Sequence, residues 1–495
     1  MNIFSFFEVE FQTIINQLVS ADLLSGDIDT SRVVFELPRD ENHGDIATNA
    51  AMVLAKQAGK SPRDLAALFV GELAKIDGVI SVDIAGPGFL NLSVESRLWT
   101  REIANIIAAN LTYGKSEIGA GEPVNVEFVS ANPTGPLHAA HARGAVIGDA
   151  LAGLMEFCGW NVTREYYIND AGGQVDVLAR STYLRYCEAL GRDIGAIPAG
   201  LYPGLYLKGV GQALATRDGE LYLDKPEAEW LETVRGFAIN AIMQGIKTDL
   251  LALGIKMDQF SSERAIVNSG AVGRAIDKLQ QNGHLYQGIL LPPKGKEPED
   301  WEPREQLLFR ASEFGDDTDR PLQKSDGTWT YFAADVAYHL DKLERTGGPL
   351  INIFGADHGG YVKRMTATVA ALSGMQNMLD IKLCQLVNLL DNGQPVKMSK
   401  RAGTFVRVED VIEAVGADVI RFIMLTRRND QTLDFDFAKV TEQSRDNPIF
   451  YVQYAHARAC SVIRQFEKDR TIPETANLGL ITDPAELAVV KMLVG

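Results

Sequence analysis

Cysteine, positive net charge and long hydrophobic runs are scarce or missing in this 495-residue sequence, and each absence excludes a class of protein. There are four cysteines, Cys158, Cys187, Cys384 and Cys460, and no two form a C-x-x-C pair. This spacing argues against a disulfide framework and against a zinc knuckle. We therefore expect a reducing, cytoplasmic location and no metal centre built from the protein's own side chains.

No run of apolar residues approaches the ~18 that a membrane-spanning helix needs, so an integral membrane protein is not expected. The segment 1–20 is not expected to be a secretory signal, because it carries Glu8 and Glu10 and lacks a basic start. It has the pattern of an amphipathic helix instead. Hydrophobic residues make up 46% of the chain, which is enough apolar material to build packed cores and excludes overall disorder.

Basic residues are outnumbered, with 48 Lys and Arg against 65 Asp and Glu, so the formal net charge is −17. This balance argues against indiscriminate binding to nucleic acid, although a specific and locally basic groove stays open.

The length suggests about three domains. Residues 1–112 have an α+β pattern, with expected helices at 4–24, 45–58 and 62–75, a strand at 33–37 and a hairpin over 79–94. Residues 441–495 begin a helical module with a long helix over 451–466, and because the sequence stops at Gly495 without a closing element, we expect it to be truncated.

Residues 113–440 alternate strands with helices, which is typical of an α/β fold. The pattern predicts a doubly wound parallel, Rossmann-like sheet that binds ligands at the carboxyl ends of its strands. The stretch 191–325 is expected to be an insertion, and 391–430 contains a turn and a lysine-rich segment. The expected strands are 124–130, 162–167, 350–354 and 381–390.

The first chemical motif follows the strand at 124–130. A loop rich in Gly and Pro leads into a helix that begins with His138 and His141, which share a helical face. A helix N-terminus attracts phosphate through its unpaired N–H groups. The two imidazoles could therefore hold a triphosphate and stabilise charge on its α-phosphate. The structural alternative is a pair of polar capping residues.

The second motif is Lys397–Arg401, which follows the turn signal Asp391–Gly393. Two lysines on a loop suit a clamp on pyrophosphate oxygens, because lysine acts as a point charge on a long stem. The structural alternative is a solvated run of charge.

Together the two motifs resemble the HIGH and KMSK signatures of class I aminoacyl-tRNA synthetases. Further segments narrow the resemblance to the arginyl-tRNA synthetases, namely 127–136, 166–174, 355–358, 403–405 and, in the N-terminal module, 43–45. The resemblance implies a tRNA-contacting domain at 1–112, a catalytic domain at 113–440 and the start of an anticodon-binding domain at 441–495. It also implies ligation of L-arginine to tRNA(Arg) through an arginyl-adenylate, with ATP and Mg2+, by a monomeric enzyme.

The resemblance also assigns residues to the site. The implied catalytic residues are His138, His141, Lys397 and Lys400. The implied ATP site comprises Ala131, Asn132, Pro133, Thr134, Gly135, Pro136, Leu137, Ala139, Ala140, Gly355, Asp357, His358, Met398 and Ser399. Many family members with an imperfect second signature carry a lysine in the loop before the first histidine, where this chain has Gly135 beside a complete Lys397–Lys400 signature.

Arginine selection needs carboxylates, because the planar guanidinium pairs with them bidentately. The resemblance places Glu263, Tyr331 and Asp335 around the guanidinium, and Tyr331 and Asp335 are spaced to share a helical face. It places Glu127, Ser130 and Asn132 around the α-amino and carboxylate groups. The structural alternatives are a surface acid for Glu263 and an ordinary helix pair for Tyr331 and Asp335.

One position departs from the family pattern. Ala140 stands where the signature normally has a glycine, at the point where adenine packs against the backbone. Two other functions stay open at this stage. One is a different class I synthetase or a nucleotidyltransferase, and the other is a non-catalytic tRNA-binding relative.

Overall fold

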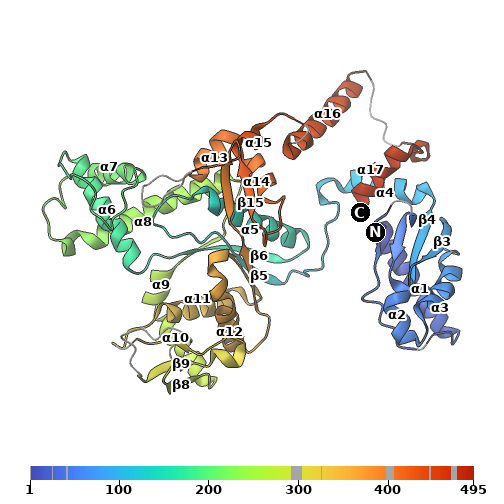
Figure 1. Cartoon of the computed structure of the whole chain (residues 1–495), viewed down its shortest axis with the longest axis horizontal. Coiled ribbons are helices and arrows are strands. Elements are labelled where there is room, and N and C mark those ends of the chain that lie inside the picture. The colour runs from blue at the N-terminus through green and yellow to red at the C-terminus, as the bar shows by residue number, and fades with distance from the viewer. Residues whose placement is uncertain are drawn as a thin grey trace. The chain divides into compact units, whose positions relative to one another are not determined.

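The computed structural model describes residues 2–24, 26–40, 43–290, 304–324, 326–396, 406–444, 447–469 and 476–495. The predicted residues Lys397, Met398, Ser399 and Lys400 lie outside the described residues. The chain forms two compact units, which are described separately (Figure 1). The first combines Met1–Gly114 with Ile463–Gly495, and the second is Lys115–Val462.

The first unit is an α+β domain on a four-stranded antiparallel sheet in the order β1-β2-β4-β3. The predicted hairpin over 79–94 is confirmed as β3–β4. The prediction of a helix over 45–58 was wrong at its start. Residues Ile46–Thr48 form strand β2, which pairs with β4, and Ile46 and Thr48 are buried. The elements are α1 (Ile3–Ser20), β1 (Phe35–Glu36), β2 (Ile46–Thr48), α2 (Ala50–Ala58), α3 (Pro62–Leu73), β3 (Val79–Ala85), β4 (Phe89–Val94), α4 (Ser96–Ala109) and α17 (Pro484–Val494).

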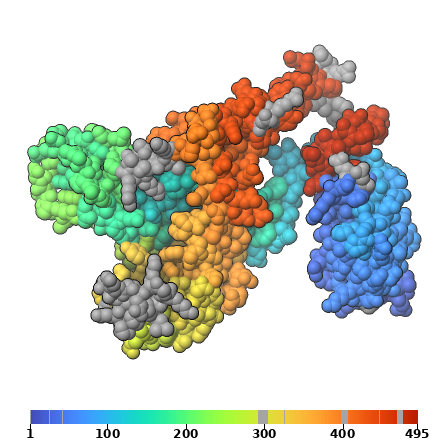
Figure 2. Space-filling model, in the orientation of Figure 1, coloured from blue at the N-terminus to red at the C-terminus, as the bar shows by residue number. Residues whose placement is uncertain are grey.

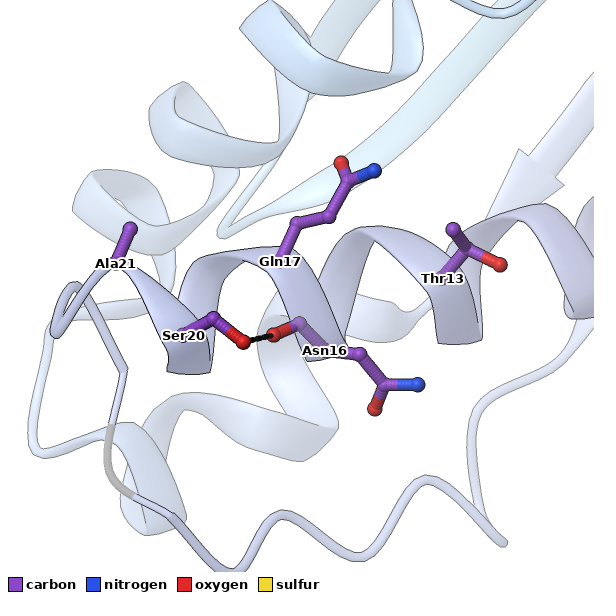
Figure 3. A pocket seen from close by; sticks show the side chains of 5 residues that line it. All are labelled: Thr13, Asn16, Gln17, Ser20 and Ala21. Atoms are coloured by element: carbon purple, nitrogen blue, oxygen red, sulfur yellow. Dashed lines mark hydrogen bonds between the residues drawn. The ribbon is translucent and has the colours of Figure 1, made fainter.

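Helix α17, which lies within the module expected at 441–495, packs in this first unit. Its Val490 and Val494 are buried in the core of the unit, and Lys491 forms an ion pair with Asp45. A shallow pocket on α1 is lined by small and polar side chains and contains no predicted site residue (Figure 3).

The second unit is built on a five-stranded parallel sheet in the order β12-β11-β5-β6-β7, which confirms the predicted doubly wound α/β fold. The strand order reverses between β5 and β11, and ligands of such sheets bind at the carboxyl ends of strands beside that reversal. The strands are β5 (Pro123–Glu127), β6 (Asn161–Ile168), β7 (Gln259–Ser262), β11 (Leu350–Gly355) and β12 (Leu379–Cys384). Helices α5 (Ala139–Phe157), α6 (Gly173–Ala189), α11 (Tyr331–Thr346) and α12 (Val362–Ser373) accompany them.

The stretch 191–325 is not one insertion, because β7 lies inside it and returns to the edge of the sheet. Before β7 come α7 (Tyr206–Asp218) and α8 (Glu227–Ala252), and after it come α9 (Glu263–Asn268), α10 (Ala271–Gln281), β8 (Leu285–Gly288), β9 (Gln306–Phe309) and β10 (Arg320–Pro321). The two parts form separate lobes of this unit, coloured green and yellow in the space-filling view (Figure 2).

The strand predicted over 381–390 is two strands in two sheets. Strand β12 ends at Cys384, and β13 (Val387–Asp391) pairs with β15 (Leu433–Asp436) and β14 (Gln394–Pro395). The turn predicted at 391–393 is confirmed, since Asn392 and Gly393 both have positive φ, 50° and 75°. The remaining helices are α13 (Val408–Val415), α14 (Ala417–Met424), α15 (Phe437–Thr441) and α16 (Pro448–Asp469), the last of which confirms the helix predicted over 451–466.

Candidate functional site

The loop after β5 begins with a strained backbone. Val129 and Ser130 have φ angles of 67° and 39°, a region that a β-branched residue such as valine rarely adopts. Two tyrosine hydroxyls donate to carbonyls further along the loop, Tyr166 to Ala131 at 2.7 Å and Tyr206 to Thr134 at 2.6 Å. Backbone strain of this kind persists where surrounding contacts hold it, and it is frequent at functional sites.

His138 and His141 lie together at the start of α5, as predicted. Their rings stack with centroids 3.6 Å apart, and the His138 backbone N–H donates to His141 Nδ1 at 3.2 Å. His141 is therefore a capping residue, which is the structural alternative raised by the sequence. This cap also sets the neutral tautomer of His141, because Nδ1 accepts and the proton must sit on Nε2.

The predicted lysine segment is flanked by described residues on both sides. Before it, the Val396 N–H donates to the Leu389 carbonyl at 2.9 Å. After it, Val406 accepts from the Ala139 N–H at 3.0 Å, and Val408 donates to Leu137 at 2.9 Å. The chain that leaves this segment is thus hydrogen-bonded directly to the turn that carries His138.

Acidic side chains gather where β6, β7 and α11 meet. Asp170 follows β6, Glu263 begins α9 directly after β7, and Asp335 lies one turn into α11. The Asp170 carboxylate accepts from Ser262 Oγ at 2.7 Å and from the Arg264 N–H at 2.9 Å. Neither Glu263 nor Asp335 forms an ion pair with any residue that the structure describes, although the charge of Arg364 acts on Asp335 and opposes the rise in its pKa.

The acids raise one another's pKa. Burial raises the pKa of Asp335 to about 7, and the negative charges of Glu263 and Glu127 contribute. Burial and the charge of Asp170 likewise raise the pKa of Glu263. Burial and the same acids raise the pKa of Tyr167, so its hydroxyl stays protonated. A bound cation between Glu263 and Asp335 would relieve this repulsion.

Tyr331 lies at the first position of α11, one turn before Asp335. Its side chain is exposed and lies against Gly172 and near the ammonium group of Lys324, which is 5.7 Å from the ring centroid. A pocket beside it has an apolar floor of Val267, Val272 and Ala334 and is also lined by Lys324, Trp329, Thr330 and Tyr331.

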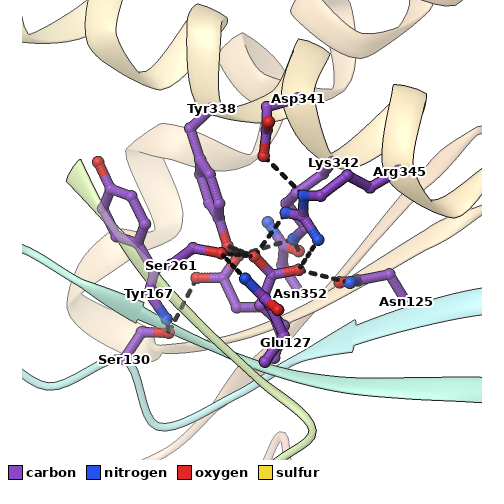
Figure 4. A network of polar contacts seen from close by, with 12 residues as sticks. Asn125, Glu127, Ser130, Tyr167, Ser261, Tyr338, Asp341, Lys342, Arg345 and Asn352 are labelled. Atoms are coloured by element: carbon purple, nitrogen blue, oxygen red, sulfur yellow. Dashed lines mark hydrogen bonds and ion pairs between the residues drawn. The ribbon is translucent and has the colours of Figure 1, made fainter. Parts of the chain in front are cut away.

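Glu127 is buried at the end of β5, and its carboxylate is surrounded by groups of its own chain (Figure 4). Oε2 accepts from Lys342 Nζ at 2.7 Å and from the Tyr338 hydroxyl at 3.0 Å. Oε1 accepts from Ser130 Oγ at 2.9 Å. Ser130 is partly exposed, whereas Asn132 is exposed and donates to Gln174 at 3.2 Å.

Sequence reasoning missed the buried network to which Glu127 belongs. Glu165 is fully buried and accepts from Asn125 at 2.6 Å, from Ser261 at 2.5 Å and from Arg345 at 2.8 Å. Burial opposes its charge, but Lys342 and Arg345 lower its pKa below the usual value. The two acids Glu127 and Glu165 thus form ion pairs with Lys342 and Arg345, whereas Glu263 and Asp335 form no ion pair among the described residues.

His339 completes this network in a neutral form. Burial and the charge of Lys342 lower its pKa to about 4. Its Nδ1 lies 2.8 Å from the Asp335 carbonyl oxygen, so Nδ1 carries the proton, and Nε2 accepts from Asn352 Nδ2 at 3.1 Å. His339 therefore fixes the helical turn that carries Asp335.

The other predicted nucleotide residues lie at the carboxyl end of β11, next to the β5 loop across the reversal in strand order. Gly355 ends the strand, and Asp357 and His358 follow in a short 3-10 turn with exposed side chains that approach to 3.7 Å. The structure thus brings together residues 131–141 and Gly355–His358 at the carboxyl ends of the neighbouring strands β5 and β11.

If Asp335 binds the guanidinium, as the sequence resemblance implies, its raised pKa predicts how arginine binding depends on pH. Below about pH 7 the free carboxyl holds a proton, which must leave before a guanidinium can pair with it. Affinity for arginine should therefore rise about tenfold per pH unit below this value and level off above it. Calorimetry at pH 6.5 in two buffers of different ionisation enthalpy should detect proton release on binding. A pH-independent affinity, with no proton released, would contradict the assignment.

No helix among the described residues is long and apolar enough to cross a membrane.

Comparisons with known proteins point to the same family as the two sequence motifs at His138–His141 and Lys397–Arg401. Residues 8–94 match the model described as arginyl tRNA synthetase N terminal domain, and residues 102–189 match the model described as tRNA synthetases class I (R), catalytic domain. The arginine–tRNA ligase of Ruegeria pomeroyi is 55% identical over 498 residues, which cover 100% of this chain and 86% of that protein. That of Cereibacter sphaeroides is 56% identical over 503 residues, with the same coverage. The structure of Thermus thermophilus arginyl-tRNA synthetase aligns with 97% of this chain and 84% of its own at a TM-score of 0.68 and 21% identity, which shows the same fold.

Proposed function

The chain belongs to the arginyl-tRNA synthetases, as its motifs predicted, and on this premise we propose how its residues carry out the ATP-dependent ligation of arginine to tRNA(Arg). The observation that supports the proposal most is the pair Glu263 and Asp335, two buried acids whose pKa values are raised and which form no ion pair among the described residues. A guanidinium would supply a paired positive charge, and its planar fork can pair with both carboxylates.

We propose that Glu263, Tyr331 and Asp335 hold the guanidinium, and that Glu127, Ser130 and Asn132 serve the α-amino and carboxylate end. This orientation is supported by the sheet, because Glu127 ends β5 at the reversal in strand order and Ser130 lies in the loop after it, whereas Glu263 follows the edge strand β7. The amino acid would then lie across the carboxyl ends of β5, β6 and β7, with its carboxylate toward the nucleotide.

ATP is proposed to bind on the side of the β5 loop that faces away from the proposed guanidinium site, toward the end of β11. The loop residues 131–137 with Ala139 and Ala140 would cradle it, and Gly355, Asp357 and His358 would hold the ribose. His138, His141, Lys397 and Lys400, with Met398 and Ser399 beside the lysines, would contact the phosphates. The Nε2–H of His141 that the cap imposes is a donor suited to a phosphate oxygen.

The first chemical step is in-line attack of the arginine carboxylate on the α-phosphorus, which releases pyrophosphate. Such a reaction needs positioning and neutralisation of charge more than covalent help. We propose that the two histidines and two lysines stabilise charge on the α-phosphate and on the leaving pyrophosphate. Mg2+ is proposed to arrive with ATP, since it is usually held by substrate phosphates and few protein ligands.

The remaining proposals concern partners and location. The tRNA is proposed to contact the domain over 1–112 and a helical anticodon-binding domain that begins at 441–495. A cytoplasmic location is consistent with the four free cysteines, and the family resemblance implies a monomeric enzyme.

Exchange of label between pyrophosphate and ATP tests the proposed function. We expect exchange only when arginine and tRNA(Arg) are both present, because the family resemblance implies activation coupled to tRNA. Exchange without any amino acid would indicate a simple nucleotidyltransferase, and neither exchange nor aminoacylation with both substrates would indicate a non-catalytic relative. Full-rate exchange with arginine but no tRNA would contradict the coupling.

Ala140 permits a milder test of the nucleotide site. It is partly exposed in the first turn of α5, where the family carries a glycine without a Cβ. Ala140→Gly should tighten ATP binding by less than about tenfold, leave arginine binding unchanged and lower the melting temperature slightly, because glycine disfavours helix by roughly 1 kcal/mol. ATP affinity and melting curves of both proteins provide the check. Equal or weaker ATP binding in the variant would show that the pocket already accommodates the methyl group.

A further inference from the structure

A buried cation, Lys342, is paired with Glu127 at one end of the proposed arginine site. It comes from α11, is fully buried, and donates to Glu127 Oε2 and to Asn352 Oδ1, both at 2.7 Å (Figure 4). The ring of Tyr338 is 5.1 Å from its ammonium group. An ammonium group has only donors, so every partner of Lys342 must present an acceptor.

The donor-only character of Lys342 also determines the direction of the hydrogen bond between Glu127 and Ser130. The Glu127 carboxylate accepts from Lys342, and the hydroxyl of Ser130 donates to its other oxygen at 2.9 Å. Ser130 Oγ also accepts from the Tyr167 N–H at 3.0 Å. A hydroxyl has one proton and two lone pairs, so the only capacity left on Ser130 is one lone pair.

The exposure of the two residues decides which of them can meet a ligand. Only 3% of Glu127 is exposed, and its oxygens are already occupied by Lys342, Tyr338 and Ser130. Ser130 is partly exposed at the start of the strained loop. A ligand at the end of β5 therefore meets Ser130, and it meets an acceptor there.

We propose that Lys342 is a positioning residue that determines the direction of the Ser130 hydrogen bonds. Its pairing with Glu127 makes Ser130 donate to that carboxylate. Ser130 is then left to accept from the α-ammonium group of the amino acid, and Glu127 acts only through Ser130. This inference rests on the proposed arginine site and refines the role of Glu127 within it. Lys342 thereby makes the site selective for a ligand that carries a protonated amine next to its carboxylate.

The test compares L-arginine with 5-guanidinovalerate, which is arginine without its α-amino group, as ligands in calorimetry. The wild-type protein should bind arginine at least about tenfold more tightly than the analogue, because the analogue lacks the charge-assisted hydrogen bond from the α-ammonium group to Ser130. In Glu127→Gln the amide oxygen should accept from Lys342, because the ammonium group can only donate. The amide N–H₂ then faces Ser130 and donates to its Oγ. The Ser130 hydroxyl must therefore donate toward the ligand instead of accepting from it. The preference for arginine should then fall to less than about threefold, while affinity for the analogue stays within about threefold of wild type.

Lys342→Met is the second variant, because it removes the cation that is paired with Glu127. A buried carboxylate without a cation takes up a proton, and it would then donate to Ser130. We expect the same loss of preference for arginine. Arg185→Met is the control, since it removes another buried cation, which pairs with Glu188 at 2.7 Å away from this network, and the preference should survive.

The outcomes separate a positioning role from a structural one. Equal weakening of both ligands in the two variants, or an unchanged preference for arginine, would overturn the inference and leave the proposed function intact. A wild-type protein that bound neither ligand would overturn the proposed arginine site itself. If Lys342→Met fails to fold, Glu127→Gln alone decides the question.

Discussion

Asp335→Asn should weaken arginine binding by at least about a hundredfold, or ~3 kcal/mol, at pH 8 while ATP affinity stays within about threefold. The reason is that the guanidinium would lose a buried charged partner and the neighbouring Glu263 would carry the pairing alone. The carboxamide keeps the shape of the side chain, so the loss reports charge rather than volume. Calorimetric titration with arginine and with an ATP analogue measures both quantities.

A matched control for this variant lies on the same helix. Glu344→Gln removes an exposed acid from α11 and should leave the affinity for arginine unchanged. The pH dependence provides a second control, because Asp335→Asn should also abolish the rise in affinity below about pH 7 that the wild-type protein shows. An arginine affinity equal to that of the wild type would remove Asp335 from the site.

Lys400→Ala should lower the rate constant of adenylate formation by about 10²–10³-fold, the range seen when one stabilising donor is lost from a transition state. Lys400 corresponds to the second lysine of the family signature, and Gly135 leaves no replacement in the upstream loop. Arginine affinity should change little, since the lysine is proposed to act on the phosphates. Single-turnover formation of the adenylate in the presence of tRNA(Arg) isolates this step.

Arg401→Ala is the neighbour control for Lys400→Ala. Both variants remove one positive charge from the same segment, so a general loss of positive charge would slow the reaction equally in each. The account expects a clearly smaller effect from Arg401→Ala. Adenylate formation at the wild-type rate in Lys400→Ala would count against the signature assignment.

The local chemistry of the sequence predicted the parts of the fold and of the site that depend on neighbours in the chain. The turn at Asp391–Gly393, the hairpin over 79–94 and the two histidines at the start of a helix all follow from spacing and residue type. The acid pair was predicted from guanidinium chemistry together with the family resemblance. The structure adds the reason for their altered pKa, which is burial beside other acids.

The parts that sequence reasoning missed depend on contacts between distant segments. Strand β7 has no apolar run, and it is a strand because β6 pairs with it. The strand predicted over 381–390 is interrupted where Arg143 of α5 binds the carbonyls of Gln385 and Gln431. Lys342 lies 215 residues from its partner Glu127, and a lysine is a residue type that is rarely buried, so nothing local predicted its position.

The most direct test of the central claim compares L-arginine with L-citrulline in calorimetry at pH 8 with the wild-type protein. Citrulline has nearly the same shape but carries a neutral urea in place of the guanidinium. If the buried pair Glu263 and Asp335 recognises a positive charge, arginine should bind and citrulline should bind at least about a hundredfold more weakly. Comparable affinity for the two amino acids would contradict the account, because it would show that the acids do not select the guanidinium.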